Sequence, residues 1–390
     1  MKTALTSVGA ALQSMIPAAV VSRQHKHKRS KSMPICKSSL PFLAENDFQM
    51  QLVAHLEVLQ QQQQPSSCTF TADWLGKALE VVLFIYSNVE DLQRMKNDIG
   101  EKWLSQHMED VINLLDVCNV LIERISQIKK YNMSVQIALR GLLHGLQIEN
   151  VTVHPQVVKS RSSLASCMDA LRKKKDMMDV ESNMDKCMST LRRMAGRLQA
   201  TSTSMAAGAG NHHICHIPIN NAMGITIFAC TALVAALSFN TPRRSSIPTA
   251  ACFNDKAKKN KISPLPLTAD PLINITCVVN TMQNKIKEVV DMQKRKRSSS
   301  SSSLLFHELD RVDITVGNIS NLLDSYFLTK TCKSSCSKQL QDQLKASIEA
   351  LSTSTTELES ALTCIEHKIS ELFKLLISTR VAHLNTLSHS

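Results

Sequence analysis

The segment Glu101–Ile128 carries the longest uninterrupted helical pattern in the chain. Its apolar residues recur at intervals of three and four, which places them along one face of an α-helix, and neither Pro nor Gly interrupts them. The acidic residues Glu109, Asp110, Asp116 and Glu123 are expected on the other, polar side. The apolar stripe consists of Leu104, Met108, Val111, Leu115, Cys118, Leu121 or Ile122, Ile125 and Ile128. The segment therefore predicts a long helix that buries one face against other helices.

The composition points to helices in the rest of the chain as well. Aromatic residues make up only 4% of the 390 residues, and there are 10 glycines. Both a β-sandwich and a nucleotide-binding α/β fold need more strand-forming residues and more glycine turns than this. Leu, Met, Gln, Lys, Ser and Ala suit helices instead, so the sequence predicts an all-α fold.

Several further segments repeat the helical pattern on either side of Glu101–Ile128. Thr71 is expected to cap the N-terminus of a helix that has Asp73 and Trp74 in its first turn. Trp103 lies at the start of the next predicted helix. The other predicted helical segments are 46–64, 162–199 (one helix or a pair), 273–292, 304–328 and 339–387. Two outcomes are open for the helix at 101–128, which either continues or kinks near Tyr131 and runs on through 135–146. Short connections between such helices favour an antiparallel helical bundle, here with long C-terminal helices of coiled-coil type and one central hydrophobic segment.

Changes in composition divide the chain into four expected regions. These are a disordered basic leader at 1–44, an N-terminal helical bundle at 45–200, an uncharged hydrophobic segment with a Pro- and Lys-rich linker at 201–270, and a C-terminal helical region at 271–390. The leader contains no Asp or Glu. It is read as a disordered tail, with an organelle transit peptide as the alternative.

The central hydrophobic segment, Met223–Phe239, has no charged residue, and basic residues follow it but do not precede it back to Leu198. A membrane-spanning helix needs about 20 apolar residues, with about 17 as a minimum. Three interpretations are open: a short membrane-embedded helix, a buried or hairpin helix, and a peripheral segment. The candidate membrane residues are Met223, Ile227, Phe228, Leu233, Val234, Leu237 and Phe239.

The net charge of +12 is concentrated in short runs at 26–31, 172–175, 256–261 and 294–297. Such runs are typical of solvated, flexible segments, and attraction to an anionic membrane surface is the main alternative. No RNA-binding signature or zinc finger accompanies them, so no specific nucleic-acid partner is expected. The 12 cysteines are scattered, and we expect Cys118 and Cys167 to act as small buried hydrophobes with reduced thiols.

No motif for catalysis or for cofactor binding is present. The sequence lacks a phosphate-binding loop, a dinucleotide-binding glycine pattern, a zinc-protease motif and a nucleophile elbow. The cluster His212, His213, Cys215 and His216 matches no common zinc-site spacing. We therefore expect no enzyme activity, no cofactor and no metal site. The candidate residues are structural core residues: Trp74, Trp103, Leu104, Met108, Val111, Leu115, Cys118 and Ile125.

Four segments resemble the plant BYPASS family. They read TADWLGKALEVVLFIYSNVEDL (71–92), EKWLSQHMEDVINLLDVCNVLIERIS (101–126), VQIALRGL (135–142) and ELFKLLISTRVAHLNTL (371–387). The family features fall on Trp74, on Lys102 and Trp103, on Leu114–Asn119, and on Ala138, Leu139 and Leu142. A poly-Gln run before Pro65 and a Ser tract at 298–303 depart from the family pattern.

The resemblance implies a non-enzymatic, membrane-associated helical protein that acts in root and shoot development by controlling a root-derived mobile signal. It implies an endomembrane or plastid location and no catalytic residues. Protein partners that bind helical surfaces are expected, with a membrane as a further partner. Two alternatives are open: a soluble coiled-coil adaptor in the cytoplasm that uses Leu304–Leu387, and a nuclear basic regulator that uses the KRKR run at Lys294–Arg297.

Overall fold

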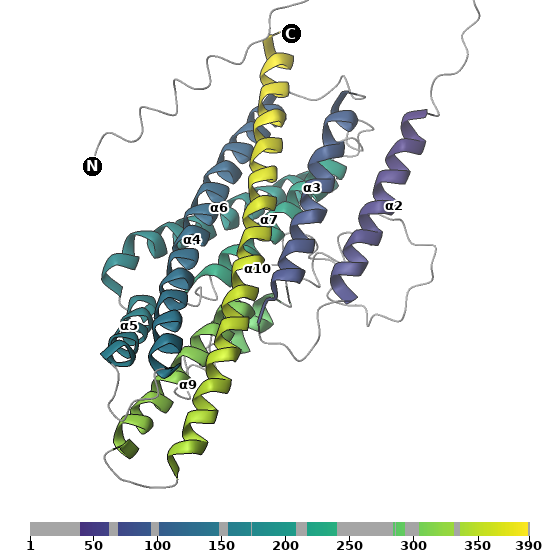
Figure 1. The fold of residues 1–390 in the computed structure, drawn as a ribbon. Helices are drawn as coiled ribbons and strands as arrows, with labels where there is room; N and C mark the ends of the chain where they lie inside the picture. Colours follow the sequence, from purple (N-terminus) through teal and green to yellow (C-terminus); the bar gives the residue numbers. More distant parts are fainter. Residues whose placement is uncertain are drawn as a thin grey trace, which may run out of the picture. The chain divides into compact units, whose positions relative to one another are not determined.

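Helices make up every element in the part of the chain that the computed structural model describes, namely residues 40–61, 69–94, 101–147, 155–172, 174–207, 217–239, 284, 286–292, 304–330 and 336–388. The helices are α2 (Leu40–Gln61), α3 (Ala72–Arg94), α4 (Glu101–Gln147), α5 (Pro155–Arg172), α6 (Lys174–Ala207), α7 (Ile217–Leu237), α9 (His307–Lys330) and α10 (Cys336–Ser388) (Figure 1). A short helical stretch also covers 286–292. The predicted all-α fold is confirmed.

Helix α4 extends beyond the segment Glu101–Ile128, whose pattern predicted a helix. It continues without a break from Glu101 through Tyr131 to Gln147, because Val135, Leu139 and Leu142 carry the same buried stripe onward. Asp110, which the sequence pattern placed on the polar side, is instead buried. It is buried because Arg197 of α6 pairs with its carboxylate.

Helices α4 and α10 lie side by side and run in opposite directions (Figure 1). The rings of His107 and His383 are 5.1 Å apart near one end of the pair. Further along, Lys129 of α4 lies 2.6 Å from a carboxylate oxygen of Glu366, and Asn132 donates to the backbone carbonyl of Thr355. Rising numbers on α4 thus meet falling numbers on α10, as the predicted antiparallel arrangement requires.

Five other helices pack against this pair. Helices α5, α6 and α7 contact α4, whereas α3 and α9 contact α10. Two glycines let α5 approach closely: a Cβ at Gly141 would lie 2.6 Å from Ser160 Oγ, and one at Gly145 would lie 2.6 Å from Val157 Cγ2. On the α9 side, Arg311 forms an ion pair of 2.5 Å with Glu357 of α10.

Chain contacts divide the protein into two compact units, 1–42 and 43–390. Helices α3 to α10 all belong to the second unit. Helices from the regions expected at 45–200 and at 271–390 are therefore packed together, because α10 contacts both α3 and α4.

Helix α7 contains most of the predicted membrane segment, and it is the most uniformly buried helix. From Ala222 to Ser238 every residue is buried, whereas Phe239 is half-buried. Helices α3, α4 and α6 pack against α7, so neighbouring side chains in the bundle supply its apolar surroundings. None of the described helices combines the length and the hydrophobicity that crossing a bilayer requires. The membrane-embedded interpretation is thus not supported, and a buried helix describes these residues.

Candidate functional site

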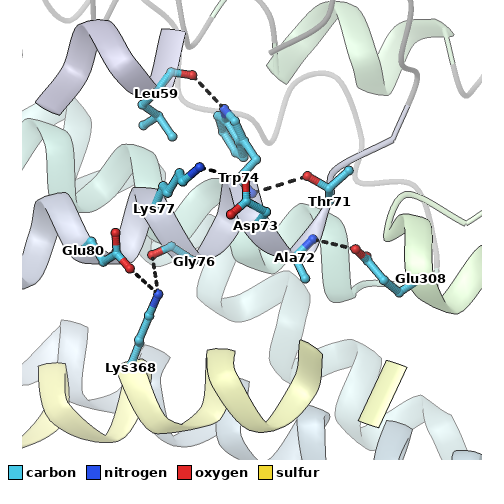
Figure 2. Close-up of polar contacts among 10 residues, drawn as sticks. All are labelled: Leu59, Thr71, Ala72, Asp73, Trp74, Gly76, Lys77, Glu80, Glu308 and Lys368. Atoms are coloured by element: carbon cyan, nitrogen blue, oxygen red, sulfur yellow. Dashed lines mark hydrogen bonds and ion pairs between the residues drawn. The ribbon is translucent and has the colours of Figure 1, made fainter. Parts of the chain in front are cut away.

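At the start of α3, polar contacts join this helix to α2, α9 and α10 (Figure 2). Phe70 forms an isolated bridge with Phe306: its N–H donates to the carbonyl of Leu305 at 2.7 Å, and its carbonyl accepts from the N–H of His307 at 2.9 Å. The chain segments that precede α3 and α9 are thereby joined by backbone hydrogen bonds. The N–H of Ala72 also donates to Glu308 Oε1 at 2.9 Å, so a carboxylate from α9 helps to cap α3.

The predicted N-cap of α3 is confirmed. The hydroxyl of Thr71 accepts a hydrogen bond from the N–H of Trp74 at 3.3 Å, which satisfies one of the free donors at the helix start. Asp73 lies in the first turn, where its charge suits the helix dipole, and it pairs with Lys77 at 2.9 Å.

Trp74 connects α3 to two other helices. Its side chain is buried, and its Nε1 donates to the carbonyl of Leu59 in α2 at 3.1 Å. Its ring contacts Phe70, and it meets Phe228 of α7 edge-on at 6.0 Å between centroids. The indole therefore combines apolar burial with a satisfied donor, as buried Trp requires.

Lys368 connects α10 to α3. Its ammonium lies 2.6 Å from Glu80 Oε1 and donates to the carbonyl of Gly76 at 3.3 Å (Figure 2). A Cβ at Gly76 would lie 3.2 Å from this ammonium, so a glycine there leaves room for the lysine.

The end of α7 is held by Arg124, the largest fully buried side chain. Its Nε donates to the carbonyl of Leu237 at 2.9 Å, and its guanidinium lies 3.7 Å from the ring centroid of Phe239. Carbonyls at a helix C-terminus attract a cation, and the aromatic face adds a cation–π contact. Arg124 is therefore the cap of the central helix.

Three thiols from three helices lie near one another in the core. They belong to Cys118 of α4, Cys187 of α6 and Cys230 of α7, which are all buried and free. Burial raises the pKa of Cys230 to about 12 and that of Cys187 to about 11, and it raises the pKa of Cys118 well above its usual value. Cys167 is also buried with a raised pKa. These thiols are protonated at neutral pH, which suits packing and opposes nucleophilic chemistry.

A second buried polar cluster lies where α4 meets α6 and α10. Burial, together with the smaller effect of the neighbouring His383, lowers the pKa of His107 to about 3. Burial also raises the pKa of Asp110, against the opposing effect of its partner Arg197. His107 is thus neutral at physiological pH.

The structure places most of the predicted core residues in the interior. Buried are Trp74, Val111, Leu115, Cys118 and Ile125, together with Met223, Ile227, Phe228, Leu233, Val234 and Leu237. Met108 and Phe239 are half-buried. The side chains of Trp103 and Leu104 lie outside the described residues.

Sequence reasoning missed the polar residues that join helices, namely His107, Arg124, Asn132, Glu308 and Lys368. Each lies in a helix whose apolar stripe was recognised, but its partner lies on a helix far away in the sequence. One local signal was available: Arg124 lies next to Ile125, a position of the apolar stripe, and a charged residue so placed can be buried.

Among the described residues, no group of three or more His, Cys, Asp or Glu side chains is arranged to hold a metal ion. The cluster at His212, His213, Cys215 and His216, residues 1–39 of the basic leader and the KRKR run lie outside the described residues.

Comparison with known proteins finds a family model described as Protein BPS1, which matches residues 85–328. The chain is 24% identical over 178 residues to UPF0496 protein 4 of Oryza sativa subsp. japonica, a match that covers 44% of this chain and 36% of the relative. It is also 24% identical over 121 residues to Protein BPS1, chloroplastic, of Arabidopsis thaliana, covering 30% of this chain and 34% of the relative. The matches thus span about a third of each relative's length. No solved structure matches.

Proposed function

Because the chain belongs to the BPS1 family, we propose that it is a non-enzymatic regulator of plant root and shoot development that controls a root-derived mobile signal. The observation that carries this proposal is the family match over residues 85–328, which is more than half of the chain. That stretch includes α4, α5, α6 and α7 in full and most of α9.

The interior favours a scaffold over a catalyst. The buried polar groups described above bind other helices: Arg124 caps α7, Lys368 connects α10 to α3, and Asp110 pairs with α6. The buried thiols have raised pKa values, so they are poor nucleophiles. Function then resides on the outer surfaces of the helices, through which protein partners bind.

Loss of the gene in the plant of origin tests this function. We expect altered root and shoot growth, restored by the intact coding sequence and not by Leu114→Asp, which places a charge in the core. Reciprocal grafting locates the signal: a disrupted root should alter a normal shoot, whereas a disrupted shoot should leave a normal root unaffected. Normal growth of lines that lack this gene and its close copies would contradict the proposal.

A second candidate, an adaptor that binds a partner helix, is favoured by α10. This helix exposes Ile377, Val381 and Leu384 at 43%, 51% and 46%, and their spacing puts them on one face. Cross-linking of the full chain in plant extracts should then depend on Val381 and not on Met50 of α2, which is exposed to a similar extent at 62%.

Membrane association without a spanning helix, in a plastid or on an endomembrane, is the location that we propose. The name of the Arabidopsis relative, Protein BPS1, chloroplastic, supports the plastid. A fluorescent fusion at the C-terminus, which leaves the leader free, should label plastids or an endomembrane. Diffuse cytosolic or nuclear signal would contradict this location.

A further inference from the structure

Exposed apolar and basic side chains lie together on the outer face of the second half of α4. Met133 and Ile137 are each 62% exposed, and the exposed Lys130 and Arg140 flank them. The spacings of three, four and three residues bring the four side chains within one arc of the helix. The result is an apolar centre with a basic residue on either side.

This part of the protein has no acidic residue of its own. The sequence contains no Asp or Glu from Arg124 to Gln147, or from Pro155 to Met168. These ranges cover the second half of α4 and most of α5, which pack together at Gly141 and Gly145. Helix α5 adds the exposed Lys159 and Val158, the latter 49% exposed.

Three of the acidic residues on neighbouring helices are already engaged. Glu366 of α10 pairs with Lys129 at 2.6 Å, Glu359 of α10 accepts from Asn132 at 3.1 Å, and Asp324 of α9 pairs with Arg161 at 2.5 Å. Among the described residues, no acidic side chain forms an ion pair with Lys130, Arg140 or Lys159. Within the part of the chain that the structure describes, no ion pair therefore neutralises the positive charge of this face.

We propose that Lys130, Met133, Ile137 and Arg140 of α4, with Lys159 of α5, form a docking face for a membrane surface that contains anionic phospholipids. Basic side chains attract such a surface at about 1 kcal/mol each, a factor of about five in binding. The apolar pair can enter the boundary between headgroups and acyl chains while the long basic side chains reach the phosphates. This inference deepens the membrane association proposed above and rests on it.

The geometry favours a membrane over a protein partner. Side chains that line a peptide groove are partly covered by its walls, whereas Met133 and Ile137 at 62% exposure project from a convex helix. A bilayer surface is flat and deformable, so it accepts a projecting ridge. The apolar stripe at Ile377 and Val381 differs, because the antiparallel pairing places it at the end of α4 that exposes Glu109 and Asp116.

Vesicle co-sedimentation of the purified full chain tests the proposal. We expect binding to phosphatidylcholine vesicles that contain roughly a third phosphatidylserine, and much weaker binding to phosphatidylcholine alone. Raising the salt from about 0.1 M to about 1 M shortens the screening length from about 10 Å to about 3 Å and should release the protein. Lys130→Gln with Arg140→Gln should weaken binding about 25-fold, and Met133→Ser with Ile137→Ser should also weaken it.

Matched variants show whether binding depends on this face or on the total charge and hydrophobicity of the protein surface. Lys186→Gln with Arg193→Gln removes two exposed basic residues from α6, and Ile377→Ser with Val381→Ser removes two exposed apolar residues from α10; both pairs should bind like the unaltered chain. Equal binding by all four double variants would assign vesicle binding to other basic runs and overturn the proposal. Binding of an acidic protein by this face, without vesicle binding, would overturn it too. Because the assay uses purified protein, its failure is distinct from a failure of the developmental role.

Discussion

At the scale of single residues, Arg124 is the largest fully buried side chain among the described residues. It is fully buried, it donates a hydrogen bond to the carbonyl of Leu237 at the end of α7, and its guanidinium lies over the ring of Phe239. Arg124→Ala should lower the free energy of unfolding by about 3 kcal/mol, because it leaves a buried carbonyl without its donor and opens a cavity. Urea unfolding followed by circular dichroism measures this.

The control for that substitution is Arg140→Ala on the exposed face of the same helix. A surface change there should alter stability by no more than about 0.5 kcal/mol. Equal effects of the two substitutions would show that Arg124 does not cap α7.

His107 makes stability depend on pH. Its pKa is about 3 in the folded protein and about 6.5 in the unfolded chain, so between these values the unfolded chain binds the extra proton. Stability is thus complete above pH 6.5 and falls as the pH drops toward 3, by up to about 1.4 kcal/mol per pH unit. From pH 7 to pH 5 we expect a loss of about 2 kcal/mol that His107→Gln removes.

Denaturant unfolding at the two pH values gives the measurement, with His144→Gln as the exposed comparison. The pKa of Asp110 is raised in the folded protein, so proton uptake by Asp110 stabilises the folded state as the pH falls. This effect opposes the effect of His107 on stability. An unchanged pH dependence in the His107 variant would contradict the assignment.

At the scale of elements, the packing of α5 on α4 depends on glycine. A Cβ at Gly145 would lie 2.6 Å from Val157 Cγ2 and 3.3 Å from the backbone nitrogen of the same residue. Gly145→Ala should therefore lower the melting temperature, although alanine favours a helix by about 1 kcal/mol over glycine. Gly196→Ala in α6 meets nothing within 4 Å and should raise it. Thermal unfolding of both variants provides the comparison, and a rise in both would mean that α5 does not pack closely here.

The helices themselves could be predicted because their signals are local. The stripe from Val111 to Ile125 and the cap at Thr71 each depend on residues within a few turns. The location of α7 could not be predicted, because an uncharged apolar run looks the same whether lipid or protein surrounds it. The burial of Arg124 depends on Leu237, which is 113 residues away, and no periodicity in α4 reveals that partner.

At the scale of the whole molecule, the thiols report whether the bundle opens as one unit. Cys118, Cys187 and Cys230 come from α4, α6 and α7 and are buried with raised pKa values, whereas Cys364 on α10 is exposed. Both burial and protonation slow alkylation. A maleimide at neutral pH should therefore modify Cys364 rapidly and the three buried thiols only through opening of the core.

Peptide mass spectrometry after timed labelling at several urea concentrations separates local from global opening. Since the three helices share one interior around α7, their thiols should become labelled together, with the denaturant dependence of global unfolding. Cys364→Ser should remove the rapid labelling of the peptide that contains this residue and leave the slow labelling of the three buried thiols unchanged. If Cys187 became labelled well before Cys118 and Cys230, α6 would separate from the bundle on its own, and the interior would consist of two cooperative units rather than one.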